Sequence, residues 1–210
     1  APESKKTRKI EFIGDSITCG FGIMAPSANS PFKTSEENPF MTYAALTAGN
    51  LGADFNLVSV SGWAAYKSVF QDASSLASIY EFTDGIHLPS VKWNFSLYQP
   101  DVVAVNLGTN DVGYLARDPA EYSSFEQYYA RFIQTLRSDN PNARIVLCYG
   151  MMGNSIASHI QAAISASGVL NVSYVALNNM KTVRCEHPSP QDHIENAQVL
   201  TAALKQIMNW

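Results

Sequence analysis

Hydrophobic residues gather in five short runs along the chain, and between these runs they return every three or four positions. The runs cover residues 10–13, 55–60, 102–107, 145–149 and 172–176. Near-continuous hydrophobic runs of this length are typical of parallel strands that are buried on both faces. Gly14, Gly108 and Gly150 stand at the ends of three of them, as turn residues do. The pattern therefore predicts five strands of one mostly parallel sheet.

Helical spacing occupies the intervals between the runs. It is seen in Phe125, Tyr129, Phe132 and Leu136, in Ile156, Ile160 and Ile164, and in Ile194, Ala197, Leu200, Leu204 and Ile207. Residues 38–51 are a further helical candidate. Strands that alternate with helices through short connections predict an open α/β sheet. In such sheets the residues that bind and react gather at the carboxyl ends of the strands.

The composition fits one compact domain and excludes several classes of protein. Of 210 residues, 46% are hydrophobic and 15% charged, which is enough apolar material for a sizeable core. The 14 basic and 18 acidic residues give a net charge of −4, whereas nucleic-acid binders normally carry a basic surplus, so we expect no nucleic-acid partner. No stretch approaches the ~20 hydrophobic residues of a membrane span, so we expect no membrane partner.

The segments that follow the predicted strands carry a hydroxyl, a glycine N–H, an amide and an imidazole. Ser16 follows the first strand, Gly62 the second and Asn110 the third, while His187 lies between the fifth strand and the last helix. A serine hydroxyl is a weak nucleophile until a base such as histidine takes its proton. Acyl transfer also needs donors for the developing oxyanion, for which the N–H groups of Ser16 and Gly62 and the Asn110 amide are available. The pattern indicates a serine esterase or a related acyl hydrolase.

Four blocks of the sequence resemble those of the SGNH (GDSL) hydrolase superfamily and stand in the family's order. They are Gly14-Asp15-Ser16-Ile17-Thr18, Gly62, Gly108-Thr109-Asn110-Asp111 and His187-Pro188. Longer stretches at residues 12–22, 37–47, 99–111 and 187–189 resemble the catalytic domain of carbohydrate esterase family two, whose members deacetylate plant polysaccharides such as xylan and mannan. The resemblance implies a three-layer α/β/α fold with a mostly parallel five-stranded sheet of the flavodoxin-like kind.

The resemblance also implies the domain boundaries. It covers residues 9–210 as the SGNH catalytic domain and leaves residues 1–8 as an N-terminal tail or the remnant of a linker. Members of carbohydrate esterase family two usually carry an N-terminal β-sandwich domain, for which this chain has no room. Two expectations follow: the domain is a partner that has been cut away, or the chain is a single-domain relative. The chain begins with Ala1 rather than Met and is interpreted as a processed product or an excised piece.

By the resemblance Ser16 is the nucleophile and His187 the general base. The backbone N–H groups of Ser16 and Gly62 and the side chain of Asn110 form the oxyanion hole. Trp63, which directly follows Gly62, is a candidate substrate contact because aromatic rings stack on sugars. We expect no cofactor and no metal. Histidine at position 193 is the competing candidate for the base, and its alternative role is to fasten the loop that carries His187.

The block around the histidine departs from the family pattern. The family places an aspartate two or three residues before the histidine, where this chain has Cys185 and Arg184. Glu186 is adjacent to His187, and neighbouring side chains meet only with unusual backbone geometry. We therefore predict a serine–histidine dyad in which a backbone carbonyl from residues 183–185 orients the imidazole.

Two further pairs of residues are given supporting roles. Asp15 and Asp111 are expected to shape their turns and to cap the helices that follow. Cys19 and Cys185 flank the predicted dyad, so they approach one another if the dyad forms. They then either form a disulfide or remain two separate buried thiols.

The sequence thus predicts a secreted or extracellular carbohydrate acetyl esterase that removes O-acetyl groups from plant polysaccharides or their oligosaccharides through an acyl-enzyme. Two alternatives stay open. A lipase- or thioesterase-like SGNH hydrolase would have a longer acyl pocket. A catalytically degenerate carbohydrate-binding module, a protein of another class, is suggested by the missing aspartate.

Overall fold

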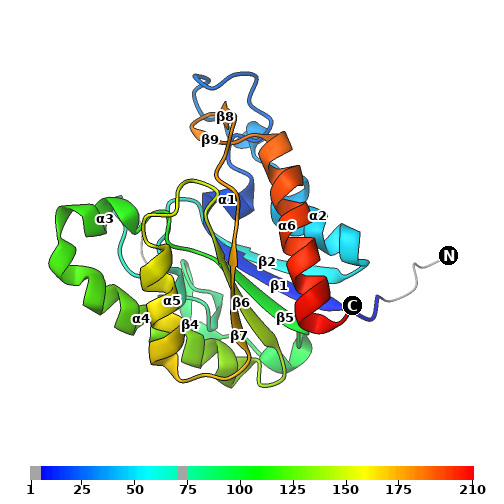
Figure 1. Ribbon diagram of the computed structural model, residues 1–210, viewed down its shortest axis with the longest axis vertical. Coiled ribbons are helices and arrows are strands. Elements are labelled where there is room, and N and C mark those ends of the chain that lie inside the picture. The colour runs from blue at the N-terminus through cyan, green and yellow to red at the C-terminus, as the bar shows by residue number, and fades with distance from the viewer. Residues whose placement is uncertain (1–5, 71–74) are drawn as a thin grey trace.

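A five-stranded sheet forms the middle layer of the protein (Figure 1), of which the computed structural model describes residues 6–70 and 75–210. Its strands are β1 (Lys9–Gly14), β2 (Asp54–Ser59), β5 (Val102–Asn106), β6 (Arg144–Tyr149) and β7 (Val172–Ala176). They lie in the order β2-β1-β5-β6-β7, and every neighbouring pair is parallel. This is the flavodoxin-like order. The predicted sheet is confirmed, and each predicted run matches its strand to within one residue at either end.

Helices cover both faces of the sheet, so the predicted three-layer fold is confirmed. The helices α2 (Tyr43–Leu51) and α6 (Pro190–Met208) lie together on one face, and α4 (Tyr122–Asp139) and α5 (Ala157–Ser167) on the other (Figure 1). Successive strand residues point to opposite faces. Phe12 and Val102 pack in the core under α2 and α6, whereas Ile13 and Val103 pack in the core under α4 and α5.

Shorter elements surround these three layers. They are the helices α1 (Ser16–Cys19) and α3 (Val112–Arg117), the hairpin of β3 (Phe82–Asp84) and β4 (Leu88–Lys92), the hairpin of β8 (Val183–Arg184) and β9 (His187–Pro188), and the 3-10 turns Thr34–Glu36, Pro39–Met41, Leu76–Ser78, Phe95–Leu97 and Pro119–Glu121. Within the described part of the chain, no helix is both long and apolar enough to cross a membrane.

The helix expected over residues 38–51 is shorter than predicted, because α2 begins at Tyr43. Asn38 instead caps the 3-10 turn at Pro39–Met41, where its side chain accepts a hydrogen bond from the N–H of Phe40. Thr42 then has an extended backbone, with φ −81° and ψ 164°, and this separates the 3-10 turn from the helix. Local side-chain caps of this kind compete with helix continuation.

The N-terminal segment runs into the sheet at Lys9, the first residue of β1. Residues 1–5 of the predicted tail lie outside the described residues. Arg8 donates a hydrogen bond to the carbonyl of Leu51 at 2.9 Å, and its guanidinium lies 5.1 Å from the ring centroid of Trp210. These contacts hold both ends of the described chain against the core beneath α2 and α6.

Candidate active site

The strands β1 and β5 lie side by side in the sheet, and their carboxyl ends position the first two predicted site residues. From these two strands the sheet continues in opposite directions, to β2 on one side and to β6 on the other, which makes their ends a topological switch point. Ser16 begins α1 directly after β1, and Asn110 follows β5. Gly14 makes the turn feasible, because a Cβ there would lie 2.0 Å from Oγ1 of Thr18.

Asp15 caps α1, as predicted, by accepting a hydrogen bond from the N–H of Ile17 at 3.0 Å. Its carboxyl group is fully buried. Its pKa is raised to about 7, mainly by burial; the capping hydrogen bond opposes the shift, and the nearby carboxyl group of Asp111 adds to it.

The serine and the histidine meet across 171 positions of sequence. Oγ of Ser16 lies 2.8 Å from Nε2 of His187, and Nδ1 of His187 lies 3.1 Å from the carbonyl oxygen of Cys185. A carbonyl oxygen only accepts, so Nδ1 carries the proton and Nε2 is free to accept from the serine hydroxyl. The carbonyl belongs to the segment 183–185, where the sequence predicted it.

A tight hairpin turn presents the histidine and its carbonyl partner. In the β8–β9 ladder Arg184 pairs with His187, so Cys185 and Glu186 form a two-residue loop. Both have left-handed backbones, with φ 46° and 64°. Two successive positive φ angles are the pattern of a type I′ turn, which is normally made by residues such as Asn-Gly. The same backbone conformation is strained for most other residues. Glu186 makes no hydrogen bond with the imidazole among the described residues.

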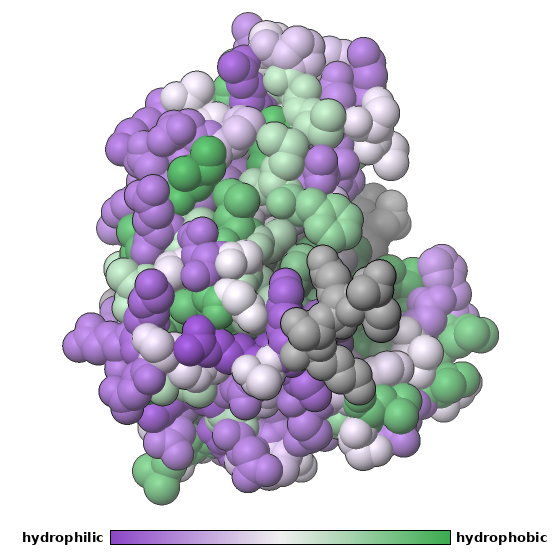
Figure 2. All heavy atoms as spheres, turned by 90° about the vertical axis from the view of Figure 1, so that its right-hand side faces the viewer, coloured by the Kyte–Doolittle hydropathy of each residue, from purple (hydrophilic) through white to green (hydrophobic). Residues whose placement is uncertain are grey.

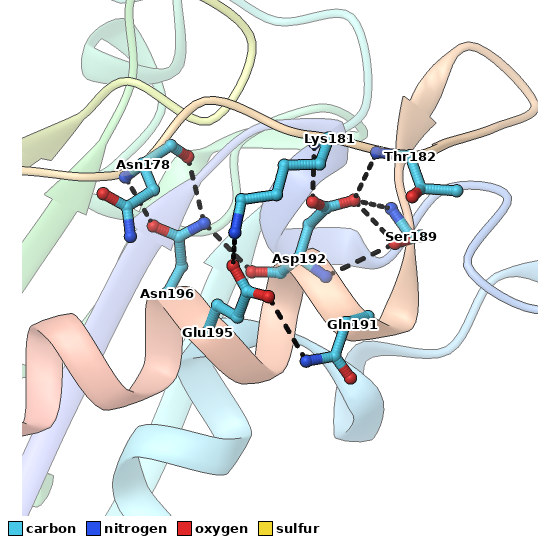
Figure 3. A network of polar contacts seen from close by, with 8 residues as sticks. All are labelled: Asn178, Lys181, Thr182, Ser189, Gln191, Asp192, Glu195 and Asn196. Carbon is cyan, nitrogen blue, oxygen red and sulfur yellow. Dashed lines mark hydrogen bonds and ion pairs between the residues drawn. The ribbon is translucent and has the colours of Figure 1, made fainter.

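Asp192 in the first turn of α6 holds the base of this hairpin (Figure 3). Its carboxylate accepts hydrogen bonds from the N–H groups of Lys181 at 2.7 Å and Thr182 at 3.3 Å, which precede β8. It also accepts from the N–H of Ser189 at 2.9 Å and from the Ser189 hydroxyl at 2.6 Å, just after β9. Both ends of the hairpin that carries His187 are therefore tied to one carboxylate.

His193 has a different role from either of those predicted for it. It is buried, and its Nδ1 accepts a hydrogen bond from the N–H of Tyr43 at 3.0 Å. Burial lowers its pKa to about 4. The expectation that it fastens the loop of His187 is wrong, because this contact joins α6 to the start of α2. The contact between Ser16 and His187 also leaves His193 without a role as the base.

The predicted oxyanion donors Gly62 and Asn110 line the same cavity as Ser16. Nδ2 of Asn110 donates to the carbonyl of Trp63 at 2.8 Å and makes a longer contact of 3.4 Å with Oδ2 of Asp15. Across residues 6–70 and 75–210, no protein acceptor is found for the backbone N–H of Ser16 or of Gly62. Gly62 has a φ of +81°, a backbone conformation that residues with a side chain rarely adopt, so glycine suits this turn.

Asp111 holds the loop after Gly62 rather than capping the next helix. Its carboxylate accepts from the N–H groups of Ala65 at 2.9 Å, Tyr66 at 2.7 Å and Lys67 at 3.1 Å. It occupies the position before α3, but its side chain makes no capping bond there, so that part of the prediction is wrong. Burial raises its pKa to about 6 although the three N–H groups oppose the shift. Three closely spaced backbone donors in one loop compete successfully for this buried carboxylate.

An open cavity of about 500 Å³ lies over the dyad. Its lining consists of Ser16, Phe21, Ser61, Gly62, Trp63, Phe70, Asn110, Glu186 and His187. An adjoining lobe of about 390 Å³ shares the dyad and adds Val69, Thr109, Val112, Gly113 and Met152. The residues predicted for the site, including the candidate substrate contact Trp63, thus share one cavity.

The sequence analysis missed two aromatic residues of this cavity. The ring of Phe21 packs on the imidazole of His187, with centroids 4.4 Å apart and a tilt of 34°. Phe70 lines both lobes and is 57% exposed. Phe21 lies in the loop directly after α1, and Phe70 lies in the loop after Gly62. Position is the only signal that marks them, because aromatic residues are most often core.

Charges near the dyad come from few groups. Burial lowers the pKa of His187, whereas the carbonyl of Cys185 and the carboxylate of Glu186 raise it in part. Among residues 6–70 and 75–210, Glu186 is the only Asp, Glu, Lys or Arg that lines either lobe. Among the described residues, no three His, Cys, Asp or Glu side chains are grouped to hold a metal ion.

All three cysteines are free, which decides between the two alternatives for the pair beside the dyad. Cys19 is half-buried and Cys185 is buried, and burial raises the pKa of both thiols. They are separate thiols that do not cross-link α1 to the hairpin.

Comparison with known proteins places this geometry in a family. The model of the GDSL-like lipase/acylhydrolase family matches residues 12–207. The cellulase/esterase CelE of Acetivibrio thermocellus is 34% identical over 97% of this chain and 26% of its own length. An acetylxylan esterase/glucomannan deacetylase of Cellvibrio japonicus is 32% identical over 97% of this chain and 58% of its own length. The chain therefore spans less than two thirds of the length of these relatives.

Solved structures agree with the sequence comparison. An acetyl xylan esterase from the rumen bacterium Butyrivibrio proteoclasticus superposes with a TM-score of 0.92 at 28% identity, over 100% of this chain and 66% of its own. A family two carbohydrate esterase from Clostridium thermocellum, solved in complex with cellohexaose, superposes with a TM-score of 0.89 at 33% identity, over 100% of this chain and 67% of its own.

Proposed function

This chain belongs to the GDSL-like lipase/acylhydrolase family and, within it, to carbohydrate esterase family two, and from this premise we propose that it is a carbohydrate acetyl esterase. Its proposed substrates are acetylated plant polysaccharides or their oligosaccharides. The 2.8 Å contact between Oγ of Ser16 and Nε2 of His187, under an open cavity, is the observation that carries the proposal. We further propose that residues 9–210 form the catalytic domain.

In the first half of the reaction Ser16 is the nucleophile. Nε2 of His187 takes the hydroxyl proton while Oγ forms a bond to the carbonyl carbon of the acetyl group. The tetrahedral oxyanion accepts hydrogen bonds from the N–H groups of Ser16 and Gly62 and from the Asn110 amide. The amide proton nearest Asp15 suits this task, because its present contact is long, at 3.4 Å. His187 then protonates the leaving sugar oxygen, and an acetyl-enzyme is left.

In the second half water resolves the acetyl-enzyme. His187 takes a proton from the water as its oxygen attacks the acetyl carbon, and the same donors stabilise the second oxyanion. Collapse of this intermediate breaks the bond to Ser16, the imidazolium returns its proton to Oγ, and acetic acid leaves and ionises to acetate in water. The carbonyl of Cys185 keeps the proton-bearing Nδ1 fixed throughout.

Plant polysaccharides are polymers too large to cross a cell membrane, so we propose that the protein acts outside the cell. Trp63, half-buried in the cavity wall, is the proposed contact with the sugar. This proposal is supported by the position of Trp63, which directly follows Gly62 and lines the same cavity as Ser16.

Release of acetate from acetylated xylan, acetylated glucomannan and small sugar acetates tests the proposal. We expect acetate release from at least one polysaccharide and faster turnover of acetyl than of butyryl or octanoyl esters of one alcohol. A preference for octanoyl esters would instead identify a lipase-like member of the family. A fluorophosphonate probe should label Ser16, and an unlabelled serine would identify a module that only binds carbohydrate.

A further inference from the structure

A second cavity, of about 450 Å³, lies beside the proposed active site. Its lining consists of Phe21, Ala28, Asn29, Ser30, Pro31, Phe32, Cys185 and Glu186. Phe21 and Glu186 also line the cavity over the dyad, so the two spaces adjoin at these side chains. In Figure 1 the blue loop that follows α1 rises beside the β8–β9 hairpin, and the second cavity lies at this junction.

The wall of the second cavity is fixed to the hairpin that carries His187. The guanidinium of Arg184 donates to the carbonyl of Pro26 at 2.8 Å, and the N–H of Cys185 donates to the carbonyl of Ser27 at 3.4 Å. Gly22 permits this approach, because a Cβ there would lie 2.5 Å from Cβ of Cys185. These contacts fix the loop at residues 26–32 relative to the dyad. Two neighbouring binding sites for one ligand need such a fixed spacing.

The chemistry of the lining suits a sugar ring. Phe32 is 39% exposed and stacks on Phe21, with ring centroids 3.8 Å apart and planes at 10°. Beside it the exposed side chains of Asn29 and Glu186 have no hydrogen-bond partner among the described residues. A pyranose offers C–H groups to an aromatic surface and hydroxyl groups to amide and carboxylate acceptors. A fatty acyl chain would leave both polar groups unused.

We propose that this cavity is a second sugar subsite, which binds an unsubstituted sugar unit next to the acetylated unit at Ser16. The inference rests on the proposed function, because it assumes that the ester is carried by a carbohydrate chain. It makes Phe32, Asn29 and Glu186 determinants of chain-length specificity, so acetylated oligosaccharides are better substrates than acetylated monosaccharides.

The kinetic test compares acetylated xylohexaose with xylose tetraacetate and with 4-nitrophenyl acetate. Wild type should show a higher kcat/KM for the hexamer than for the monosaccharide. Phe32→Ala should lower the ratio of these two values about fivefold, the effect of one lost aromatic contact. The matched control is Phe40→Ala, which removes an exposed ring that lines none of these cavities and should leave the ratio as in wild type.

Two kinetic outcomes would overturn the subsite. One is an unchanged ratio in Phe32→Ala. The other is an equal loss on all three esters, since the ring would then act only through Phe21 on the imidazole. Circular dichroism and the melting temperature of each variant establish that it is folded.

A binding test separates failure of the subsite from failure of the proposed function. Calorimetry with the Ser16→Ala variant and unacetylated xylohexaose should give a Kd that rises about fivefold when Phe32→Ala is added. If wild type released no acetate but this rise appeared, the subsite would stand and the esterase proposal would fail. If wild type released acetate but Phe32→Ala left the Kd unchanged, the subsite would fail alone.

Discussion

At the scale of single residues, His187 is oriented by a carbonyl oxygen where many serine hydrolases use a carboxylate. The Cys185 carbonyl fixes which nitrogen carries the proton but brings only a partial negative charge to the imidazole. Burial therefore dominates and lowers the pKa of His187 below its ordinary value of 6.5. A base with a lowered pKa is neutral, and so competent, over a wider range of pH.

The first prediction concerns this pH range. His187 accepts a proton only when neutral, so kcat/KM for 4-nitrophenyl acetate should rise with pH through a pKa below 6.5 and then stay level. Glu186 raises the pKa of His187, so Glu186→Gln should move the rise to still lower pH. Initial rates at constant ionic strength measure both profiles. A rise of kcat/KM centred near pH 7 would contradict the assignment of His187 as the titrating base, because it would match the pKa of Asp15 instead.

The second prediction separates the dyad from its acidic neighbour. Ser16→Ala and His187→Ala should each lower kcat for acetyl esters by at least about 10⁴-fold, because each removes a group that takes part in bond making. Glu186→Ala should lower it only a few-fold, since this carboxylate makes no hydrogen bond with the imidazole. Purified variants are compared by acetate release. If Glu186→Ala lowered kcat as much as His187→Ala does, Glu186 would be the third member of a catalytic triad.

At the scale of elements, the β8–β9 hairpin joins the histidine, its carbonyl partner and the adjoining loop in one unit. Its turn has two non-glycine residues with left-handed backbones, Cys185 and Glu186. Such conformations cost L-residues about 1 kcal/mol each and persist where the surroundings hold them. Asp192 supplies that hold, because it bonds backbone groups before β8 and after β9.

The third prediction tests the turn with two variants that both remove the carboxylate. Glu186→Gly adopts the left-handed backbone freely, whereas Glu186→Val resists it because of its branched Cβ. The valine variant should therefore have a kcat for 4-nitrophenyl acetate at least about tenfold below that of the glycine variant. Steady-state kinetics with matched melting curves measure the difference. Equal kcat values would show that the turn conformation does not govern the position of His187.

The fourth prediction concerns the junction between α2 and α6. His193→Ala leaves the buried N–H of Tyr43 without an acceptor and should lower the free energy of unfolding at pH 7 by about 3 kcal/mol. The folded pKa of His193 is about 4, so below pH 6.5 the unfolded wild type takes up a proton that the folded form does not. Acid therefore destabilises wild type selectively through this group.

Its measurement is urea unfolding of wild type and His193→Ala between pH 7 and pH 4.5. The difference in free energy of unfolding should shrink by about 2 kcal/mol over this range. The folded pKa values of Asp15 and Asp111 are raised, so these carboxyl groups stabilise the folded protein as the pH falls. Their contribution is the same in wild type and in the variant, so it cancels in the difference. A difference that stayed constant or widened would mean that the folded His193 takes up a proton as readily as the unfolded one.

At the scale of the whole molecule, the charge of the protein opposes anionic substrates. The net charge is −4, and of the charged residues that the structure describes only Glu186 lines the cavity lobes over the dyad. On the face seen in Figure 2 hydrophilic side chains predominate, and hydrophobic ones form separate patches among them. A negative field of this kind slows the approach of negative ligands and favours neutral ones.

The fifth prediction uses salt to reveal this field. The kcat/KM for the anionic ester 4-acetoxybenzenesulfonate should rise about twofold between 20 mM and 500 mM NaCl, because salt screens the repulsion. The kcat/KM for neutral phenyl acetate, which serves as the control, should stay nearly constant. Glu186→Gln should weaken the salt effect on the anionic ester. A fall in its kcat/KM with salt would show that a cation attracts it.

Much of this protein could be predicted from short stretches of sequence. The five strands follow from hydrophobic runs, because a strand buried on both faces needs apolar residues at successive positions. Ser16, Asn110 and His187 could be proposed because parallel strands direct their carboxyl ends to one edge. Neither position 184 nor position 185 holds an aspartate, and this was enough to predict a backbone carbonyl as the partner of the imidazole. In each case the deciding information is local or follows from one rule of topology.

Only the tertiary structure decided how distant side chains pair. The carboxylate of Asp111 turns to the loop at residues 65–67, Asp192 holds both ends of the hairpin, and His193 accepts from Tyr43 on another helix. Phe21 and Phe32 join the site by stacking rather than by any motif. A buried polar or aromatic group takes whichever partner the packed chain brings within reach, and that choice is made only when the layers come together.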